Sequence, residues 1–244
     1  MLRLLMRTRH FLPDTLWRPL SRLYWNWFWR KEEALEEQQL QKKSQQKIAG
    51  SERAVLAEAI AECYPFSSLL EVGCGYGQNF YTIAPHYPHA LLIGIDNDET
   101  IIQEGQIRLD QANLSRVRLI RADAQDLSEI DDNKFDIVVS CGFLLYIKDT
   151  EIETVIGEML RVCRKRLLLM EQHQQEDSDK AQGLGTVVEG GADGGQYWIR
   201  DYRQLLSRFL ASEKIRLTKV ANPRWKVEQW KDLAHLVEVK LTAE

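Results

Sequence analysis

A glycine-rich turn between residues 69 and 77 is the segment best suited to hold a ligand. The run Leu69-Leu-Glu-Val-Gly-Cys-Gly-Tyr-Gly77 begins as an apolar strand and then places glycine at every second position. Because glycine lacks a Cβ atom, its backbone can adopt positive φ angles and approach a ligand closely. A nucleotide cofactor whose sugar and tail cross such a turn needs that clearance. The turn therefore predicts cofactor contacts from Glu71, Gly73, Gly75 and Gly77.

The spacing of these glycines distinguishes between classes of cofactor. The dinucleotide fingerprint places its third glycine three residues after the second, where it allows close helix packing beside the pyrophosphate. Here that position is Gln78, and the third glycine stands one residue earlier, at Gly77. The spacing favours a cofactor without a pyrophosphate and argues against an NAD-dependent dehydrogenase.

Acidic residues follow the next two apolar runs of the chain. Asp96 closes the run Ile93-Gly-Ile-Asp96, roughly 20 residues after the glycine turn, where nucleotide-binding folds place a ribose-binding acid. Its carboxylate can accept hydrogen bonds from both ribose hydroxyls, although Asp96 also suits the N-cap of a helix. In Arg121-Ala-Asp123-Ala124, the carboxylate can accept from an adenine amine while the Ala124 backbone meets a ring nitrogen. The predicted cofactor contacts are completed by Asn97 and Ser140.

Positioning these residues requires a scaffold that brings the ends of several strands together. From Ser67 onward, short and strongly apolar runs alternate with helical patterns, which indicates an α/β fold with a parallel sheet covered on both faces. The predicted strands are Leu69–Val72, Leu91–Ile95, Val117–Arg121, Phe135–Ser140, Arg166–Met170, Ile215–Val220 and His235–Leu241. The predicted helices are Arg53–Glu62, Phe80–Ala84, Thr100–Ala112, Glu151–Val162 and Asp201–Leu210.

The order of these elements resembles that of the class I S-adenosylmethionine (SAM)-dependent methyltransferases. The glycine motif, the ribose acid, the adenine acid and the strand Phe135-Asp-Ile-Val-Val-Ser-Cys-Gly142 with its aromatic loop follow that family's order over residues 67–172. The resemblance implies a Rossmann-like, seven-stranded, mostly parallel sheet with helices on both faces and its last strand antiparallel. It also implies SAM as the cofactor and a methyl acceptor beside it.

A weaker resemblance concerns the acceptor. The basic run Arg161-Val-Cys-Arg-Lys-Arg before the fifth strand, and Tyr197-Trp-Ile-Arg200-Asp201-Tyr202 further on, resemble segments of methyltransferases from bacterial surface-glycan and nonulosonate pathways. This resemblance implies a small-molecule acceptor such as a glycan precursor or a lipid-linked substrate. The Gly- and acid-rich stretch Gln174–Gln196 is predicted to be a mobile loop suited to act as a lid.

The acceptor should lie beyond the carboxyl ends of the strands. Tyr146, Glu171 and His173 are the predicted catalytic residues, and Arg200 and Asp201 are the predicted substrate contacts. Three of them have a simpler alternative: Tyr146 shapes the pocket, His173 is a surface histidine, and Arg200 supports the following helix. A general base is required only if the acceptor is a hydroxyl or a protonated amine.

The composition excludes several other kinds of site. The formal net charge of −4 and a pI near 5.8 argue against nucleic acid as a partner. The four cysteines are scattered, with no C-x-x-C pair and no histidine at ligand spacing, so no metal site is expected and a reducing, cytoplasmic compartment fits. No run reaches the ~20 apolar residues of a membrane-spanning helix.

Residues 1–30 differ from the rest of the chain, because they carry six arginines against one acid, with tryptophans interleaved. Such a segment suits an interfacial helix on an anionic membrane, packing against the domain or another copy of the chain, or a cleaved presequence. We predict an N-terminal helical extension over 1–50 and the methyltransferase domain over 51–244. The alternative function is a SAM-binding, catalytically weak regulatory or scaffold module, recruited by peripheral membrane contact or self-association through residues 1–30.

Overall fold

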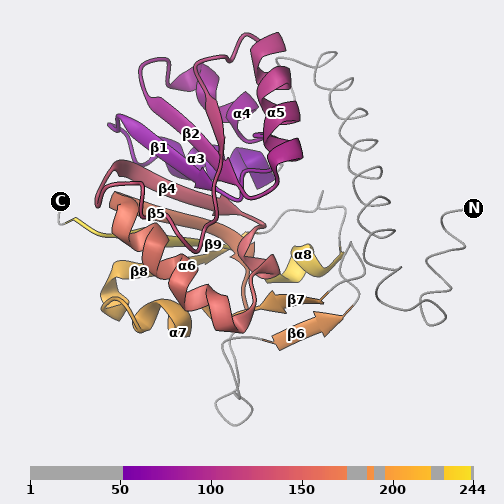
Figure 1. The fold of residues 1–244 in the computed structure, drawn as a ribbon. Helices are drawn as coiled ribbons and strands as arrows, with labels where there is room; N and C mark the ends of the chain where they lie inside the picture. Colours follow the sequence, from indigo (N-terminus) through magenta and orange to yellow (C-terminus); the bar gives the residue numbers. More distant parts are fainter. Residues whose placement is uncertain (1–51, 175–185, 190–195, 221–227, 243–244) are drawn as a thin grey trace, which may run out of the picture. The chain divides into compact units, whose positions relative to one another are not determined.

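The computed structural model describes residues 52–174, 186–189, 196–220 and 228–242 (Figure 1). The extension predicted over 1–50 therefore lies outside the described residues, as do the interpretations attached to it. Contacts divide the chain into two units, and the unit formed by Ile48–Val187 and Trp198–Glu244 contains the main sheet. Within the described ranges, no helix is long and apolar enough to cross a membrane.

A seven-stranded sheet organises this unit, in the order β3-β2-β1-β4-β5-β9-β8. Strands β1 to β5 run parallel, whereas β9 is antiparallel to both β5 and β8. This arrangement confirms the Rossmann-like sheet with one inserted antiparallel strand. The strands are β1 (Ser68–Val72), β2 (Leu91–Asp96), β3 (Arg118–Arg121), β4 (Phe135–Cys141), β5 (Cys163–Gln172), β8 (Ile215–Lys219) and β9 (Ala234–Lys240).

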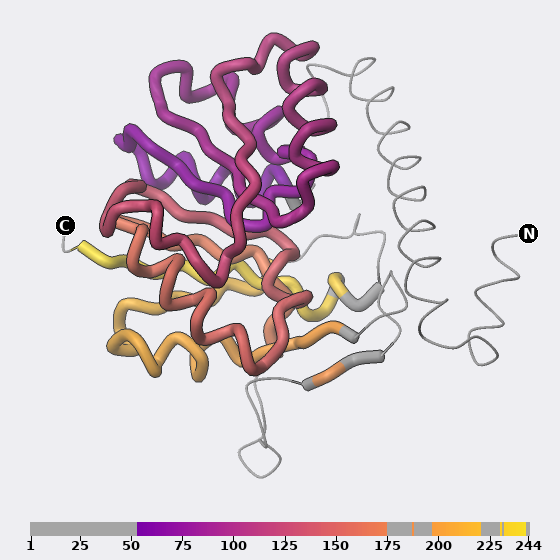
Figure 2. The backbone as a smooth tube through the Cα atoms, in the orientation of Figure 1, coloured from indigo at the N-terminus to yellow at the C-terminus, as the bar shows by residue number. Residues whose placement is uncertain are grey.

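Helices connect the strands and cover both faces of the sheet, and Figure 2 traces the backbone through them. The apolar side chains of α3, α4 and α5 belong to one buried cluster, and those of α6 and α7 belong to the other. The described helical segments are α3 (Glu52–Ala61), α4 (Phe80–Ile83), η2 (Ala84–His86), α5 (Glu99–Gln111), η3 (Leu144–Tyr146), α6 (Asp149–Val162), α7 (Tyr202–Ser207), η4 (Ser212–Lys214) and α8 (Glu228–Leu233).

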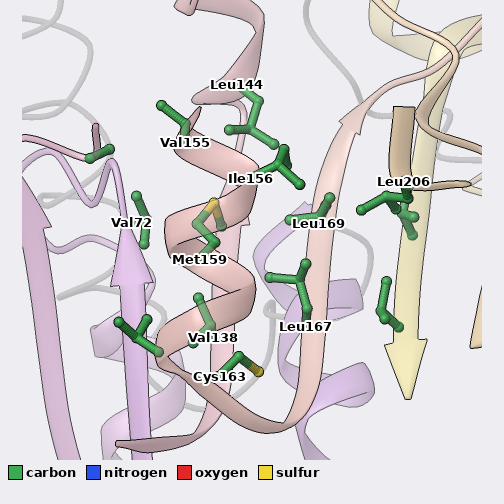
Figure 3. Close-up of a cluster of buried hydrophobic side chains, with 14 of the residues drawn as sticks. Val72, Val138, Leu144, Val155, Ile156, Met159, Cys163, Leu167, Leu169 and Leu206 are labelled. Carbon is green, nitrogen blue, oxygen red and sulfur yellow. The ribbon is translucent and has the colours of Figure 1, made fainter. Parts of the chain in front are cut away.

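The central strands are apolar throughout because they are buried on both faces. In β5, Leu167 and Leu169 join the cluster beneath α6, whereas Leu168 and Met170 join the opposite one. This alternation follows from the two-residue period of a strand. Figure 3 shows the first cluster, in which α6 lies over the strands and contributes Met159.

The C-terminal half differs from the prediction in three places. Strand β5 starts at Cys163 and runs to Gln172, so Glu171 is part of the strand. Residues predicted to form a loop include a strand, β6 (Thr186–Glu189), which pairs with β7 (Gln196–Ile199) in a separate two-stranded sheet. Flanking glycines and acids concealed this short β-branched run, and helix α8 was also missed.

A buried carboxylate ties together the amino ends of the central strands. Asp136 of β4 accepts hydrogen bonds from the Ser67 amide at 2.7 Å and the Arg164 Nε at 2.8 Å, and its Oδ1 lies 3.1 Å from the Lys165 Nζ. Burial alone would raise the pKa of Asp136, but these hydrogen bonds outweigh burial and hold the pKa well below its usual range.

Replacing this carboxylate should weaken the fold. We expect Asp136→Asn to lower the free energy of unfolding by about 2 kcal/mol at neutral pH, because the basic partners lose their counter-charge. The wild-type carboxylate contributes its stability above the unfolded pKa of 3.8 and loses it as the pH falls below that value. Urea unfolding should therefore show the difference between the two proteins shrinking in acid. A difference independent of pH would contradict this account.

Candidate cofactor and acceptor site

The glycine turn after β1 has the backbone conformation that its sequence predicts. Gly73, Gly75 and Gly77 have φ angles of 71°, 53° and 73°. The amides of Gly73 and Cys74 donate to the carbonyl of Ile95 at 2.9 and 3.0 Å, which anchors the turn to the end of β2. A Cβ atom added at Gly75 would meet nothing within 4 Å, whereas one at Gly73 would lie 2.1 Å from the ring of Phe143. Gly75 thus leaves the open space that a cofactor crossing the turn requires.

Asp96 ends β2 and lies directly against this turn. Its Oδ2 accepts a hydrogen bond from the Gly75 amide at 3.1 Å, and its Oδ1 accepts from the Asp98 amide at 3.0 Å. The N-cap of α5 is Asp98, whose side chain accepts from the amides of Thr100 and Ile101. The helix-capping role considered for Asp96 is therefore performed by Asp98. The Asp96 carboxylate is left beside the glycine that faces open space.

The other predicted cofactor contacts of this edge follow β2 and β3, which are paired. Asn97 is exposed, and its carbonyl accepts a hydrogen bond from the Arg121 Nε at 3.4 Å. Asp123 is also exposed, with Oδ1 accepting from the Gln125 amide at 2.9 Å, while Ala124 is buried. The sheet register pairs Asp96 with Arg121. Asp96 and Asp123, the predicted ribose and adenine acids, therefore follow neighbouring strands at the same edge of the sheet.

Glu71 is a buried carboxylate within β1, close to the turn in sequence. Its Oε1 accepts a hydrogen bond from the Asn79 Nδ2 at 2.6 Å, and its buried Oε2 has no partner in the described part of the chain. Burial raises the pKa of Glu71 to about 7, although the bond from Asn79 and the charge of Arg53 oppose the shift. An acceptor oxygen without a protein donor suits a hydrogen-bond donor such as the ammonium or hydroxyl groups of SAM.

Ser140 and Glu171 meet at the carboxyl ends of β4 and β5. The fully buried Glu171 accepts three hydrogen bonds at Oε1, from the Ser140 Oγ at 2.9 Å and the amides of Phe143 and Leu144 at 3.1 and 3.2 Å. Burial raises the pKa of Glu171 to about 7, and these bonds oppose the shift. The structure therefore joins a predicted cofactor contact to a predicted catalytic residue.

The predicted substrate contacts make internal bonds. The fully buried Arg200 donates from Nη1 to the Leu144 carbonyl at 2.8 Å and from Nη2 to the Ile147 carbonyl and the Asp149 Oδ1, the latter at 3.1 Å. Asp201 is the N-cap of α7, and its side chain accepts from the Gln204 amide at 3.0 Å. Tyr146 lies in η3, within the segment that Arg200 contacts, and its side chain is exposed.

Two histidines lie side by side where β5 ends and β9 begins, with ring centroids 4.8 Å apart. The His173 Nδ1 accepts from the Tyr202 amide at 3.1 Å, so the proton of the neutral ring is on Nε2. The His235 Nδ1 donates to the Leu233 carbonyl at 2.9 Å, which leaves the lone pair on Nε2. Burial lowers the pKa of His173, and the charge of His235 lowers it further. Of the two neutral rings, His235 is the one whose lone pair lies on Nε2.

Sequence reasoning missed three of these side chains. Asn79 and His235 belong to no motif, and Phe143 was expected only as part of the aromatic loop after the fourth strand, without a contact of its own. Gly142, with a φ angle of 65°, gave a usable signal for Phe143, because it marks a sharp change of direction after β4. In the ranges that the structure describes, no three His, Cys, Asp or Glu side chains form a metal-binding group.

The two glycines of the turn should respond differently to alanine. Both substitutions place a side chain at positive φ, which costs about 1 to 2 kcal/mol. Gly73→Ala must also displace the Phe143 ring, so we expect a larger loss of stability, of about 3 kcal/mol. Gly75→Ala should fold but fill the space that the cofactor crosses. Thermal unfolding measures the loss of stability, and calorimetric titration measures SAM binding. Equal losses of stability in Gly73→Ala and Gly75→Ala would contradict the close packing of Phe143 on Gly73.

The buried Glu71 should make stability depend on pH. A carboxyl whose pKa rises from 4.5 to about 7 on folding favours its protonated form, so the folded state loses stability as the pH rises through that interval. We expect Glu71→Gln to remove this loss, worth up to about 3 kcal/mol, and to gain on the wild type between about pH 5 and pH 8. Urea unfolding at both pH values measures the gain. An unchanged pH dependence would show that Glu71 is ionised throughout.

Comparisons with known proteins agree with this geometry. A family model described as "Methyltransferase domain" matches residues 69–166. A phosphatidylethanolamine N-methyltransferase from Cereibacter sphaeroides is 35% identical over 99 residues, which cover 40% of this chain and 45% of that protein. A probable SAM-dependent methyltransferase from Saccharomyces cerevisiae is 30% identical over 95 residues, which cover 38% and 32%. The chain spans less than half the length of these curated relatives.

Solved structures share the fold at low sequence identity. The N-terminal domain of EvdMO1, crystallised in the presence of SAH and D-fucose, aligns with a TM-score of 0.58 at 16% identity, over 85% of this chain and 96% of that one. A SAM-dependent methyltransferase from Aquifex aeolicus aligns with a TM-score of 0.53 at 13% identity, over 76% and 89%. These matches show that the chain has the fold of the class I SAM-dependent methyltransferases, and the family match to a methyltransferase domain covers residues 69–166 of it.

Proposed function

We propose that this protein transfers a methyl group from SAM to a small-molecule acceptor at the carboxyl edge of the sheet. The observation that carries the proposal is the turn at Gly75, which faces open space while its amide is bonded to the Asp96 carboxylate. Glu71, with its unpartnered Oε2, lies in the strand that leads into the turn. Gly75 leaves space for the cofactor, Asp96 can accept hydrogen bonds from its ribose, and Glu71 supplies a further hydrogen-bond acceptor.

In this proposal, each part of the cofactor has its own protein contacts. Asp96 accepts from the ribose hydroxyls, and Asp123 with the Ala124 backbone holds the adenine. Glu71 accepts from the amino acid end. When bound, SAM supplies an electrophilic methyl group on a sulfonium centre. The protein's main contribution is to hold the acceptor in line with that methyl group, because proximity and orientation supply much of the rate enhancement.

A proton must leave if the acceptor is a hydroxyl or a protonated amine. We propose His235 as its recipient, because its Nε2 retains a lone pair while Nδ1 donates to Leu233. His173 can accept a proton only if its bond from the Tyr202 amide breaks, because Nε2 already carries the ring proton and Nδ1 accepts from that amide. Tyr146, which is exposed after β4, is proposed to contact the acceptor.

The acceptor is proposed to be a lipid headgroup or its soluble precursor rather than a glycan precursor. Two relatives support this choice by name: the phosphatidylethanolamine N-methyltransferase of Cereibacter sphaeroides, and phosphoethanolamine N-methyltransferase 1 of Triticum aestivum, which is 27% identical over 127 residues. Both matches cover half of this chain or less. Incubation with radiolabelled SAM and phosphoethanolamine, phosphatidylethanolamine vesicles or sugar nucleotides separates these acceptor classes.

Cofactor binding provides the sharpest test. Calorimetry should show SAM binding to the wild type and at least about tenfold weaker binding to Asp96→Ala, which loses the proposed ribose bonds. Asp98→Ala is the matched control, because it removes the cap of α5 but none of the proposed ribose bonds, and it should cost about 1 kcal/mol of stability without weakening SAM binding. Equal affinities for all three proteins would overturn the proposed site. Binding without methyl transfer to any acceptor would instead favour the regulatory or scaffold module.

A further inference from the structure

The segment between β4 and α6 is held by two buried charged side chains from distant parts of the chain. This segment, residues 143–149, contains η3 and has no strand neighbours of its own. Leu144 and Leu145 within it are buried. Buried backbone N–H and C=O groups need hydrogen-bond partners. The single turn of η3 supplies two bonds within the segment, from the amides of Tyr146 and Ile147. Further partners come from Glu171 and Arg200.

Glu171 satisfies the beginning of the segment. A single oxygen, Oε1, accepts the amides of Phe143 and Leu144 together with the Ser140 hydroxyl. The other oxygen, Oε2, has no partner in the described part of the protein. The three bonds thus depend on one carbonyl-like oxygen rather than on the negative charge as such. A glutamine, which keeps such an oxygen, should preserve them.

Arg200 satisfies the middle and the end of the segment. Its guanidinium donates to the carbonyls of Leu144 and Ile147 and to the Asp149 side chain at the start of α6. Leu144 is therefore fixed from both sides, with its amide on Glu171 and its carbonyl on Arg200. A guanidinium has several donors in a fixed plane and can bond three acceptors at once, which a lysine ammonium cannot reproduce in the same geometry.

The fixed segment links the two halves of the site. At its start, the Phe143 ring packs so closely on the cofactor turn that a Cβ atom at Gly73 would lie 2.1 Å from it. Three residues later, Tyr146 is exposed, and its amide donates to the Phe143 carbonyl at 3.0 Å. A change in the backbone at Leu144 would therefore displace both the ring that covers the turn and the tyrosine beyond it.

From these contacts we infer that Glu171 and Arg200 are positioning residues, which couple the cofactor turn to the acceptor side by holding residues 143–149 in one conformation. This inference rests on the proposed function only for its kinetic consequences. Buried charges cost desolvation energy that an apolar core avoids, so stability alone does not account for them. These two side chains hold the backbone of residues 143–149 in one conformation, where no neighbouring strand does so.

Amide hydrogen exchange, measured by mass spectrometry on peptides covering residues 142–149, tests the inference without any substrate. We expect exchange in this segment to quicken at least about tenfold in Glu171→Ala and in Arg200→Lys, because bonds to a charged group are lost. Glu171→Gln should stay within a few-fold of the wild type. Asp136→Asn is the matched control, since it alters a buried carboxylate at the opposite end of β4 and should leave this segment protected.

Binding and turnover give the second readout. Glu171→Ala and Arg200→Lys should weaken SAM binding and lower kcat together, and Glu171→Gln should restore both. Protection of residues 142–149 that is unchanged in Glu171→Ala and Arg200→Lys would overturn the inference. So would a Glu171→Gln protein that keeps the segment protected but loses turnover, because Glu171 would then act in the chemistry itself. A wild type without methyl transfer would count against the proposed function alone, since the exchange experiment would still decide the inference.

Discussion

Burial of the central strands on both faces is the constraint on which the rest of this structure depends. Strands β1, β4 and β5 lie in the middle of the sheet and bury nearly every side chain. A polar group within them must find hydrogen bonds inside the protein, so it is confined to positions near a strand end, where loops can reach it. Asp136 occupies the amino end of β4, and Ser140 and Glu171 occupy carboxyl ends.

The two ends of the sheet use buried carboxylates for different purposes. Asp136 is surrounded by donors, and its pKa lies below the usual range, so it acts as a charged anchor. Glu71 and Glu171 each have one oxygen without a hydrogen-bond partner among the described residues, and burial raises the pKa of each to about 7. One end of the sheet therefore contributes stability. At the other end, burying Glu71 and Glu171 costs desolvation free energy, and these side chains supply hydrogen-bond acceptors beside the glycine turn and the segment 143–149.

The family match to known methyltransferases covers the part of the chain that holds the proposed cofactor contacts. The matched residues 69–166 include the glycine turn, Asp96, Asp123 and the segment after β4. Arg200, Asp201 and His235 all lie beyond that match, on elements that reach the same edge from the C-terminal half of the chain. This division is consistent with a shared way of holding SAM and an acceptor side particular to this protein.

The parallel sheet and the glycine turn could both be predicted from local sequence alone. Strand–helix alternation predicted the parallel sheet, because a strand apolar on both faces must be covered on both. Glycine spacing predicted the turn, because only glycine adopts positive φ there without strain. The strand β6, in contrast, was predicted to be loop, since four residues among glycines and acids give too short a pattern to recognise.

The roles of Glu171, Arg200 and His235 were decided by the tertiary structure. As sequence, Glu171 and Arg200 are polar residues near strand ends, equally compatible with an exposed catalytic site and with a buried support. The tertiary structure brings the ends of β5 and β7 to the segment after β4. It shows that Glu171 and Arg200 are both buried against the backbone of residues 143–149. The sequence by itself determined which segments become strands and where the chain can turn sharply, because those properties depend on neighbouring residues. The polar contacts of Glu171 and Arg200 join residues 27 or more positions apart, such as Glu171 with Leu144 and Arg200 with Asp149, and no local pattern records them.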